Sequence, residues 1–159
     1  MITLVQRVRW ARVSVDGTVV GSIEQGALLL VGVETGDSPA DADTTARKIA
    51  ALRLFPGRTA MDKTLAEVGG GCLVVSQFTL AADLRHGNRP DCTAAAAPTV
   101  AEPLYDQVAR QLAATGLPVA TGRFGASMLV DSGNDGPVSL ILTVRQGKVV
   151  ARPASEPTA

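Results

Sequence analysis

The feature that most constrains the fold is a continuous apolar segment, ALLLVGV at residues 27–33, which follows a glycine. A strand with one solvated face alternates apolar and polar residues, so a strand that is apolar throughout needs cover on both faces. Seven residues are far too few to cross a bilayer, which takes about 20. The segment therefore predicts a central strand of a soluble domain, buried between layers of other elements.

Two segments have the pattern of helices that would cover this strand. The first spans about 38–54, because a serine N-cap and a proline open it and a Pro-Gly pair follows it. The second spans about 99–114, between a capping threonine and the glycine at position 116. In both segments apolar residues recur at intervals near the helical period, which predicts one buried face on each helix.

The remaining apolar segments are short and rich in β-forming residues. Strands are expected at 2–8, in a hairpin 12–23 that turns at Asp16-Gly17, and at 72–80, 118–122, 127–131 and 138–145. The pattern predicts a mixed α/β or α+β domain, strand-rich, with two main helices. We expect one domain over 1–145 and a polar, flexible tail over 146–159.

Charge and cysteine usage exclude several classes of protein. Fifteen basic residues balance fifteen acidic ones, so any contact with nucleic acid has to be local. Two cysteines are too few for a disulfide framework, and the single histidine, His86, excludes a His-rich metal site. The N-terminus lacks the pattern of a secretory signal, which favours a cytoplasmic protein.

Two polar segments stand out once the common motifs have been tested. The sequence contains no Walker A motif, no G-x-G-x-x-G and no G-x-S-x-G. Segment 76–80, SQFTL, ends a predicted strand, where freed backbone N–H groups suit an oxyanion. Ser76 or Thr79 could act as a nucleophile only with a neighbouring base, and the sequence offers none. Segment 134–139, NDGPVS, has the residues of a turn and leads into an apolar strand.

In order along the chain, these segments resemble the D-aminoacyl-tRNA deacylases. The similarity runs from Gln6-Arg7-Val8 to about Val144. It rests on SQFTL at 76–80, on the loop with Arg85, Gly87 and Arg89-Pro90, on GRFGASM at 122–128 and on NDGPVS at 134–139. One position departs from the family pattern, since Ser139 stands where the family usually has threonine.

The resemblance implies an activity and an assembly. The family hydrolyses the ester between a D-amino acid and the 3′ end of tRNA, and its substrates include glycyl-tRNA mischarged on the alanine tRNA. It implies a β-sheet or barrel core that forms a homodimer, with no cofactor, no metal, no DNA and no membrane partner. A cis Gly136-Pro137 peptide is expected to reach into the partner's site, where its carbonyls hold the substrate's α-amino group and exclude L-residues.

The resemblance also assigns roles to individual residues. Backbone N–H groups near Phe78 and Thr79 would stabilise the oxyanion, with Ser76 and Gln77 shaping the pocket. The terminal adenosine would lie against Phe124, Gly125 and Met128. Arg85 and Arg89 would meet phosphates of the acceptor stem. The Gly-Pro segment would be braced by Arg7, Asn134 and Ser139.

Two other functions remain open from the residues themselves. One is an esterase in which Thr79 or Ser76 forms a covalent intermediate, which trapping an acyl-enzyme would reveal. The other is a non-catalytic module that binds nucleotide ends, which the neutral charge and missing acid–base pair would also suit. A turnover assay separates both from the deacylase.

Overall fold

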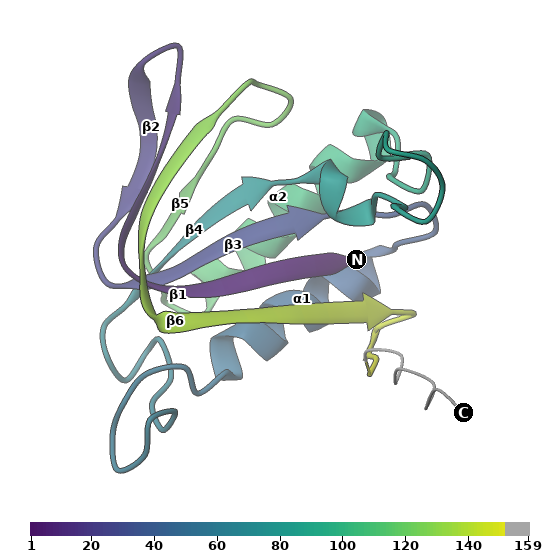
Figure 1. Ribbon diagram of the computed structural model, residues 1–159. Helices are drawn as coiled ribbons and strands as arrows, with labels where there is room; N and C mark the ends of the chain where they lie inside the picture. The colour runs from purple at the N-terminus through teal and green to yellow at the C-terminus, as the bar shows by residue number, and fades with distance from the viewer. Residues whose placement is uncertain (152–159) are drawn as a thin grey trace.

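The computed structural model describes residues 1–151 and has a mixed α/β architecture with two α-helices, which confirms the predicted fold class (Figure 1). The elements in chain order are β1 (Ile2–Val15), β2 (Thr18–Ile23), β3 (Gly26–Gly32), α1 (Pro39–Ala51), β4 (Gly71–Ser76), the 3₁₀ turn η1 (Phe78–Ala81), α2 (Pro98–Ala114), β5 (Val119–Thr121), β6 (Leu129–Arg145) and β7 (Lys148–Val149). Among the described residues, no helix is both long enough and apolar enough to span a membrane.

The sheet has the order β5-β4-β3-β1-β6-β7, with β2 paired to β1. Strands β3, β4 and β5 run parallel and are joined through α1 and α2, whereas β1 is antiparallel to β3 and β6. The apolar strand β3 therefore lies inside the sheet, and nearly all of it is buried, as its sequence predicts. Both helices lie against one side of the sheet (Figure 1).

The long strands β1 and β6 bend sharply and carry the β1–β2 hairpin away from the helices (Figure 1). This bend divides the core into two apolar clusters. The larger cluster joins the sheet to the helices and includes Leu29, Ile49 and Val108. The smaller one lies within the curl of the sheet and includes Val13 and Leu73. Val31 of the larger cluster and Val75 of the smaller one, at the ends of β3 and β4, line one cavity between the clusters.

Several elements end at residues other than those expected. Helix α1 stops at Ala51 because the backbone of Leu52 is extended and Leu54 begins to pair with Lys63. Strand β4 stops at Ser76, where a 3₁₀ turn replaces the predicted continuation to residue 80. The strands expected at 127–131 and 138–145 are one strand, β6, because its partner β1 continues across the bend.

The segment 146–159, expected as a flexible tail, begins instead as part of the sheet. Gln146 and Gly147 both have positive φ and form a tight turn that returns the chain to β6 as β7. The Gly147 N–H donates to Asp41 Oδ1 at 2.9 Å, and its carbonyl accepts from Thr44 Oγ1 at 2.9 Å. These two bonds attach the turn before β7 to α1. The rest of the predicted tail, residues 152–159, lies outside the described residues.

Candidate active site

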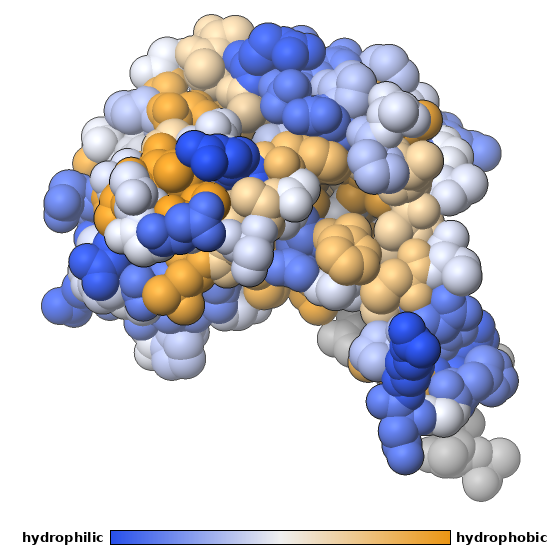
Figure 2. All heavy atoms as spheres, turned by 90° about the horizontal axis from the view of Figure 1, so that it is seen from above, coloured by the Kyte–Doolittle hydropathy of each residue, from blue (hydrophilic) through white to orange (hydrophobic). Residues whose placement is uncertain are grey.

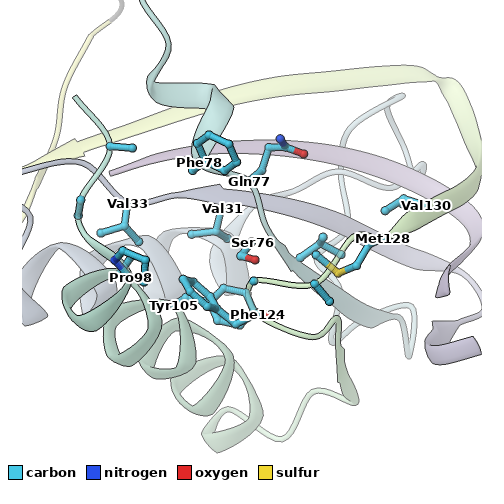
Figure 3. A pocket seen from close by; sticks show the side chains of 16 residues that line it. Val31, Val33, Ser76, Gln77, Phe78, Pro98, Tyr105, Phe124, Met128 and Val130 are labelled. Atoms are coloured by element: carbon cyan, nitrogen blue, oxygen red, sulfur yellow. The ribbon is translucent and has the colours of Figure 1, made fainter. Parts of the chain in front are cut away.

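A cavity of about 530 Å³ lies where strands β3 and β4 end (Figure 3). Val31 and Val33 close one side, η1 and the start of α2 border it, and segment 124–130 forms the opposite wall. The lining is mainly apolar, with the Ser76 hydroxyl near its centre and the Gln77 side chain beside Phe78. Such a cavity suits a flat, partly apolar ligand that is oriented by a few hydrogen bonds.

Six of the residues singled out in the sequence line this one cavity. They come from two distant segments: Ser76, Gln77 and Phe78 at the end of β4, and Phe124, Gly125 and Met128 between β5 and β6. Phe124 and Met128 lie across the cavity from Phe78 (Figure 3). An aromatic ring and a thioether facing an open space are a suitable surface for an unstacked base.

Tyr105 forms part of the cavity wall and was not expected there. Its buried hydroxyl donates to the Val74 carbonyl at 2.8 Å, and its ring lies 5.8 Å from that of Phe124. Burial raises the pKa of Tyr105 to about 12, so the phenol remains a neutral donor at physiological pH. One signal in the sequence could have pointed to Tyr105: it is the single tyrosine of the chain and lies in a predicted helix with a buried face. A tyrosine hydroxyl that is buried needs a hydrogen-bond partner.

The chain turns abruptly after β4, and this turn leaves backbone donors free. The Gln77 N–H continues the sheet by donating to the Val31 carbonyl at 2.8 Å. The next residues, Phe78 and Thr79, open a 3₁₀ turn, whose first N–H groups have no acceptor within the turn. The Gln77 amide donates to Thr79 Oγ1 and ties the turn together. Phe78 and Thr79 therefore have neighbouring backbone N–H groups without an acceptor in the turn. Phe78 lines the cavity, whereas Thr79 follows it in the turn and is not one of the lining residues.

The cavity contains little acid–base chemistry of its own. Among the residues that line the cavity, Tyr105 is the one with an ionisable side chain, and no Asp, Glu, His, Lys or Arg is present. No group of three or more metal-ligating side chains occurs within residues 1–151. The cavity is thus built to bind and polarise a ligand through fixed dipoles rather than to exchange protons through side chains.

Arg85 and Arg89 do not line the cavity but lie in the neighbouring loop 83–91. Arg85 is paired with Asp83 through hydrogen bonds of 2.6 and 3.0 Å. The hydrogen bonds from Arg85 lower the pKa of Asp83 to about 2. The charge of Arg85 is therefore already matched by a carboxylate, and the loop as a whole has two arginines and two aspartates.

Gly136 and Pro137 are the exposed residues of a bulge at the bend of β6, residues 135–138, which we call the tip. Gln6 pairs with Ser139 and Val8 with Asn134, so four residues of β6 lie opposite Arg7 alone. The peptide bond between Gly136 and Pro137 is cis. Arg7 pairs with Ala27, at the start of β3, whereas the cavity lies beyond Val31 at its other end. Within one chain, the tip and the cavity are thus separated by the length of the strand.

Three side chains hold the tip in place. Arg7 is buried and its Nε donates to the Asp135 carbonyl at 3.0 Å, while Nη1 donates to the Leu54 carbonyl at 2.7 Å. Asn134 accepts from the Val138 N–H at 3.1 Å and donates to Ser139 Oγ at 3.0 Å. The hydroxyl of Ser139 is therefore in use, although this residue lacks the methyl group of a threonine.

Comparison with known proteins shows the family to which this chain belongs. The family model described as D-Tyr-tRNA(Tyr) deacylase matches residues 4–143. The chain belongs to this family. A D-aminoacyl-tRNA deacylase of Ruegeria pomeroyi is 51% identical over 145 residues, covering 91% of this chain and all of that protein. One from Thermomicrobium roseum is 54% identical over 143 residues, covering 89% and 93% respectively.

Solved structures agree on the fold of this deacylase family. A structure described as c-Myc DNA Unwinding Element Binding Protein superposes with a TM-score of 0.85 at 35% identity, covering 91% of this chain and 99% of that one. A probable eukaryotic D-amino acid tRNA deacylase, at 14% identity, has a TM-score of 0.77 and shows the fold alone. The resemblance seen in the sequence is confirmed, and family membership makes the chain a hydrolase acting on ester bonds.

Proposed function

We propose that the chain releases D-amino acids from D-aminoacyl-tRNA and glycine from glycyl-tRNA by hydrolysis of the ester at the tRNA 3′ end. The observation that carries this proposal is the cavity itself: its apolar lining offers a surface for a base, and Phe78 at its edge opens a turn whose first backbone N–H groups have no acceptor within the turn. This arrangement accommodates the two parts of an aminoacyl-adenosine at once. The names of the relatives supply the class of substrate.

The chemistry follows from those donors. Water adds to the ester carbonyl, and the resulting oxyanion is held by the N–H groups of Phe78 and Thr79. The intermediate collapses by releasing the ribose oxygen, which takes up the proton that the water lost. Because no side-chain base lines the cavity, we assign the orientation of the water to the 2′-hydroxyl of the substrate. Removing one oxyanion donor from a hydrolase typically slows it about 10²–10³-fold.

Chiral selection would come from a second copy of the chain. The tip of one protomer cannot reach its own cavity, because the two lie at opposite ends of the same strands. In a homodimer the tip would enter the partner's cavity, where the carbonyls of Gly136 and Pro137 receive the substrate's α-amino group. An L-side chain would then collide with this backbone, while a D-side chain would point away from it.

Exposed apolar side chains on the surface support such a dimer. Phe78 and Ile141 are each 61% exposed, and Leu129 is 65% exposed. Hydrophobic residues also gather on the face seen from above, where hydrophilic residues border them (Figure 2). Patches of this kind mark interaction sites in soluble proteins. The homodimer, like a cytoplasmic location, is part of the proposal.

The proposal is tested by incubating the enzyme with D-tyrosyl-tRNA and glycyl-tRNA and quenching the reaction in acid. Free amino acid should accumulate over many turnovers, with no labelled protein in the acid precipitate. A stable acyl-protein adduct would indicate a covalent esterase. Binding of both substrates without release, by a folded protein, would indicate a non-catalytic module.

A further inference from the structure

The charges of this chain balance overall, but not around the loop that follows α1. Residues 47–67 contain five basic side chains and two acidic ones, against fifteen of each in the whole chain. Two of the basic residues, Arg53 and Arg58, flank the same carboxylate: they lie 4.0 and 3.7 Å from Asp62. Their side chains are 60% and 89% exposed. We call residues 53–63 the basic loop.

The two acidic side chains of this region serve the backbone. Asp62 Oδ2 accepts from the Arg58 N–H at 2.9 Å and closes the loop. Glu67 accepts from the N–H and the hydroxyl of Thr64 at 2.7 and 2.9 Å. Ion pairs of 3.7–4.0 Å between exposed groups contribute little, so the guanidinium groups of Arg53 and Arg58 remain available to an external anion.

The position of the basic loop is fixed relative to the Gly136–Pro137 tip. The buried guanidinium of Arg7 donates to the carbonyls of Leu54 and Ala60, at 2.7 and 3.4 Å, and to the carbonyl of Asp135 at 3.0 Å. One side chain therefore joins the loop to the tip. In Figure 1 the loop lies beneath the bend of β1 and β6, on the side of the molecule away from η1.

We propose that the basic loop binds backbone phosphates of the tRNA whose 3′ end occupies the partner's cavity. This inference rests on the proposed function, because the tip that enters that cavity carries the loop to its rim. Exposed arginines are well suited to phosphate oxygens, which their planar group can bind in bidentate fashion. The loop 83–91 is the weaker candidate, since its arginines and aspartates are equal in number and Arg85 is already paired.

The test is binding of deacylated tRNA as a function of salt concentration, with the double variant Arg53→Gln/Arg58→Gln. We expect the Kd to rise several-fold at low salt. The slope of log Kd against log salt should fall by about one for each phosphate that the variant no longer binds. Lys148→Gln is the matched control, because it removes one exposed positive charge from β7 and should leave the slope unchanged.

Turnover of two substrates separates this inference from the proposed function. On D-aminoacyl-tRNA the double variant should have a raised KM, whereas on D-aminoacyl-adenosine, which lacks phosphates, its kinetics should match the wild type. An unchanged salt slope would overturn the inference, as would equal losses on both substrates, which would mean that the loop acts through Arg7. If the wild type hydrolysed neither substrate while the tRNA-binding difference persisted, the proposed function would fail and the phosphate-binding loop would stand.

Discussion

At the scale of single residues, the proposed hydrolysis depends on which groups in and beside the cavity act on the ester. Thr79 could act through its side chain or through its backbone. Its hydroxyl accepts a hydrogen bond from the Gln77 amide, while its backbone N–H has no acceptor within the turn. Its side chain has no basic neighbour among the lining residues of the cavity. We therefore assign the contribution of Thr79 to its backbone.

The first prediction is that Thr79→Ala keeps most of its activity, with kcat reduced by less than about tenfold, because a backbone donor survives truncation of the side chain. Single-turnover release from D-tyrosyl-tRNA measures it. Thr79→Ser is the matched control. If alanine abolished turnover and serine restored it in a folded protein, Thr79 would be a nucleophile.

The second prediction concerns Gly136, which has φ +125°, a conformation that L-residues rarely adopt. A Cβ there would lie 2.9 Å from Arg7 Nη2 and 2.9 Å from a methyl group of Val138. Gly136→Ala should therefore displace the tip and reduce the ratio of D- to L-release. Gly116→Ala provides the comparison, since Gly116 also has positive φ but open space around it. An undisturbed ratio in Gly136→Ala would argue against the role of the tip.

At the scale of elements, helix α1 is anchored at its start by a single carboxylate. Asp41 Oδ2 accepts from the N–H and the hydroxyl of Ser38, both at 2.8 Å, and Oδ1 accepts from the Gly147 N–H. Burial of Asp41 would raise the pKa of its carboxyl, but these hydrogen bonds outweigh it and hold the pKa below the ordinary value of 3.8. One side chain thus joins α1 to the turn before β7.

The third prediction follows from the sign of that shift. Because the pKa of Asp41 is lower in the folded state, its contribution to stability is complete above the ordinary pKa and is lost as pH falls through the folded value. Asp41→Asn should lower the free energy of unfolding by about 1–3 kcal/mol at neutral pH. Urea titrations at pH 7 and pH 3 measure it, and the difference from wild type should shrink at the lower pH. A constant difference would contradict the assignment.

Some helices and strands of this fold can be predicted from local sequence patterns, and others cannot. The buried strand β3 and both helices follow from apolar periodicity, and the Ser38 cap of α1 also follows from the sequence, because these signals depend on near neighbours. The cap expected at Thr99 is wrong: α2 begins at Pro98, its N-cap is Ala97 without a side-chain hydrogen bond, and Thr99 lies inside the helix. The single bent strand β6 does not, because its course depends on the long-range register with β1, where four residues lie opposite one. Tyr105 is a similar case: its helix could be predicted, but its place in the cavity wall depends on how α2 packs on β4.

The family resemblance related distant segments of the chain to one another, which periodicity did not. Spacing alone indicated a strand end at Ser76 and a turn at Asn134, without relating either to Phe124. The structure brings Ser76 and Phe124 to one cavity and leaves Gly136 at the far end of the strands. The proposed meeting of tip and cavity therefore needs two chains, and a pattern within one chain does not predict it.

At the scale of the whole molecule, the fourth prediction is that dimerisation and activity are lost together. Ile141 is exposed on β6 although its neighbour Leu142 is buried towards the helices. Ile141→Asp should shift the protein to a monomer in sedimentation velocity and slow turnover sharply, because the cavity would lack the partner's carbonyls that hold the substrate's α-amino group. Val149→Asp, at an exposed position on β7, should leave both unchanged. A fully active monomer would rule out a site completed in trans.

The central claim is that one rigid cavity removes D-amino acids from tRNA and spares L-amino acids. The most direct measurement is the initial rate of amino acid release from D-tyrosyl-tRNA and L-tyrosyl-tRNA, side by side, at low enzyme concentration. We predict rapid release from the D-substrate while the L-substrate decays no faster than without enzyme. Equal rates on the two substrates would contradict the account, because a tip that excludes L-side chains cannot be indifferent to chirality.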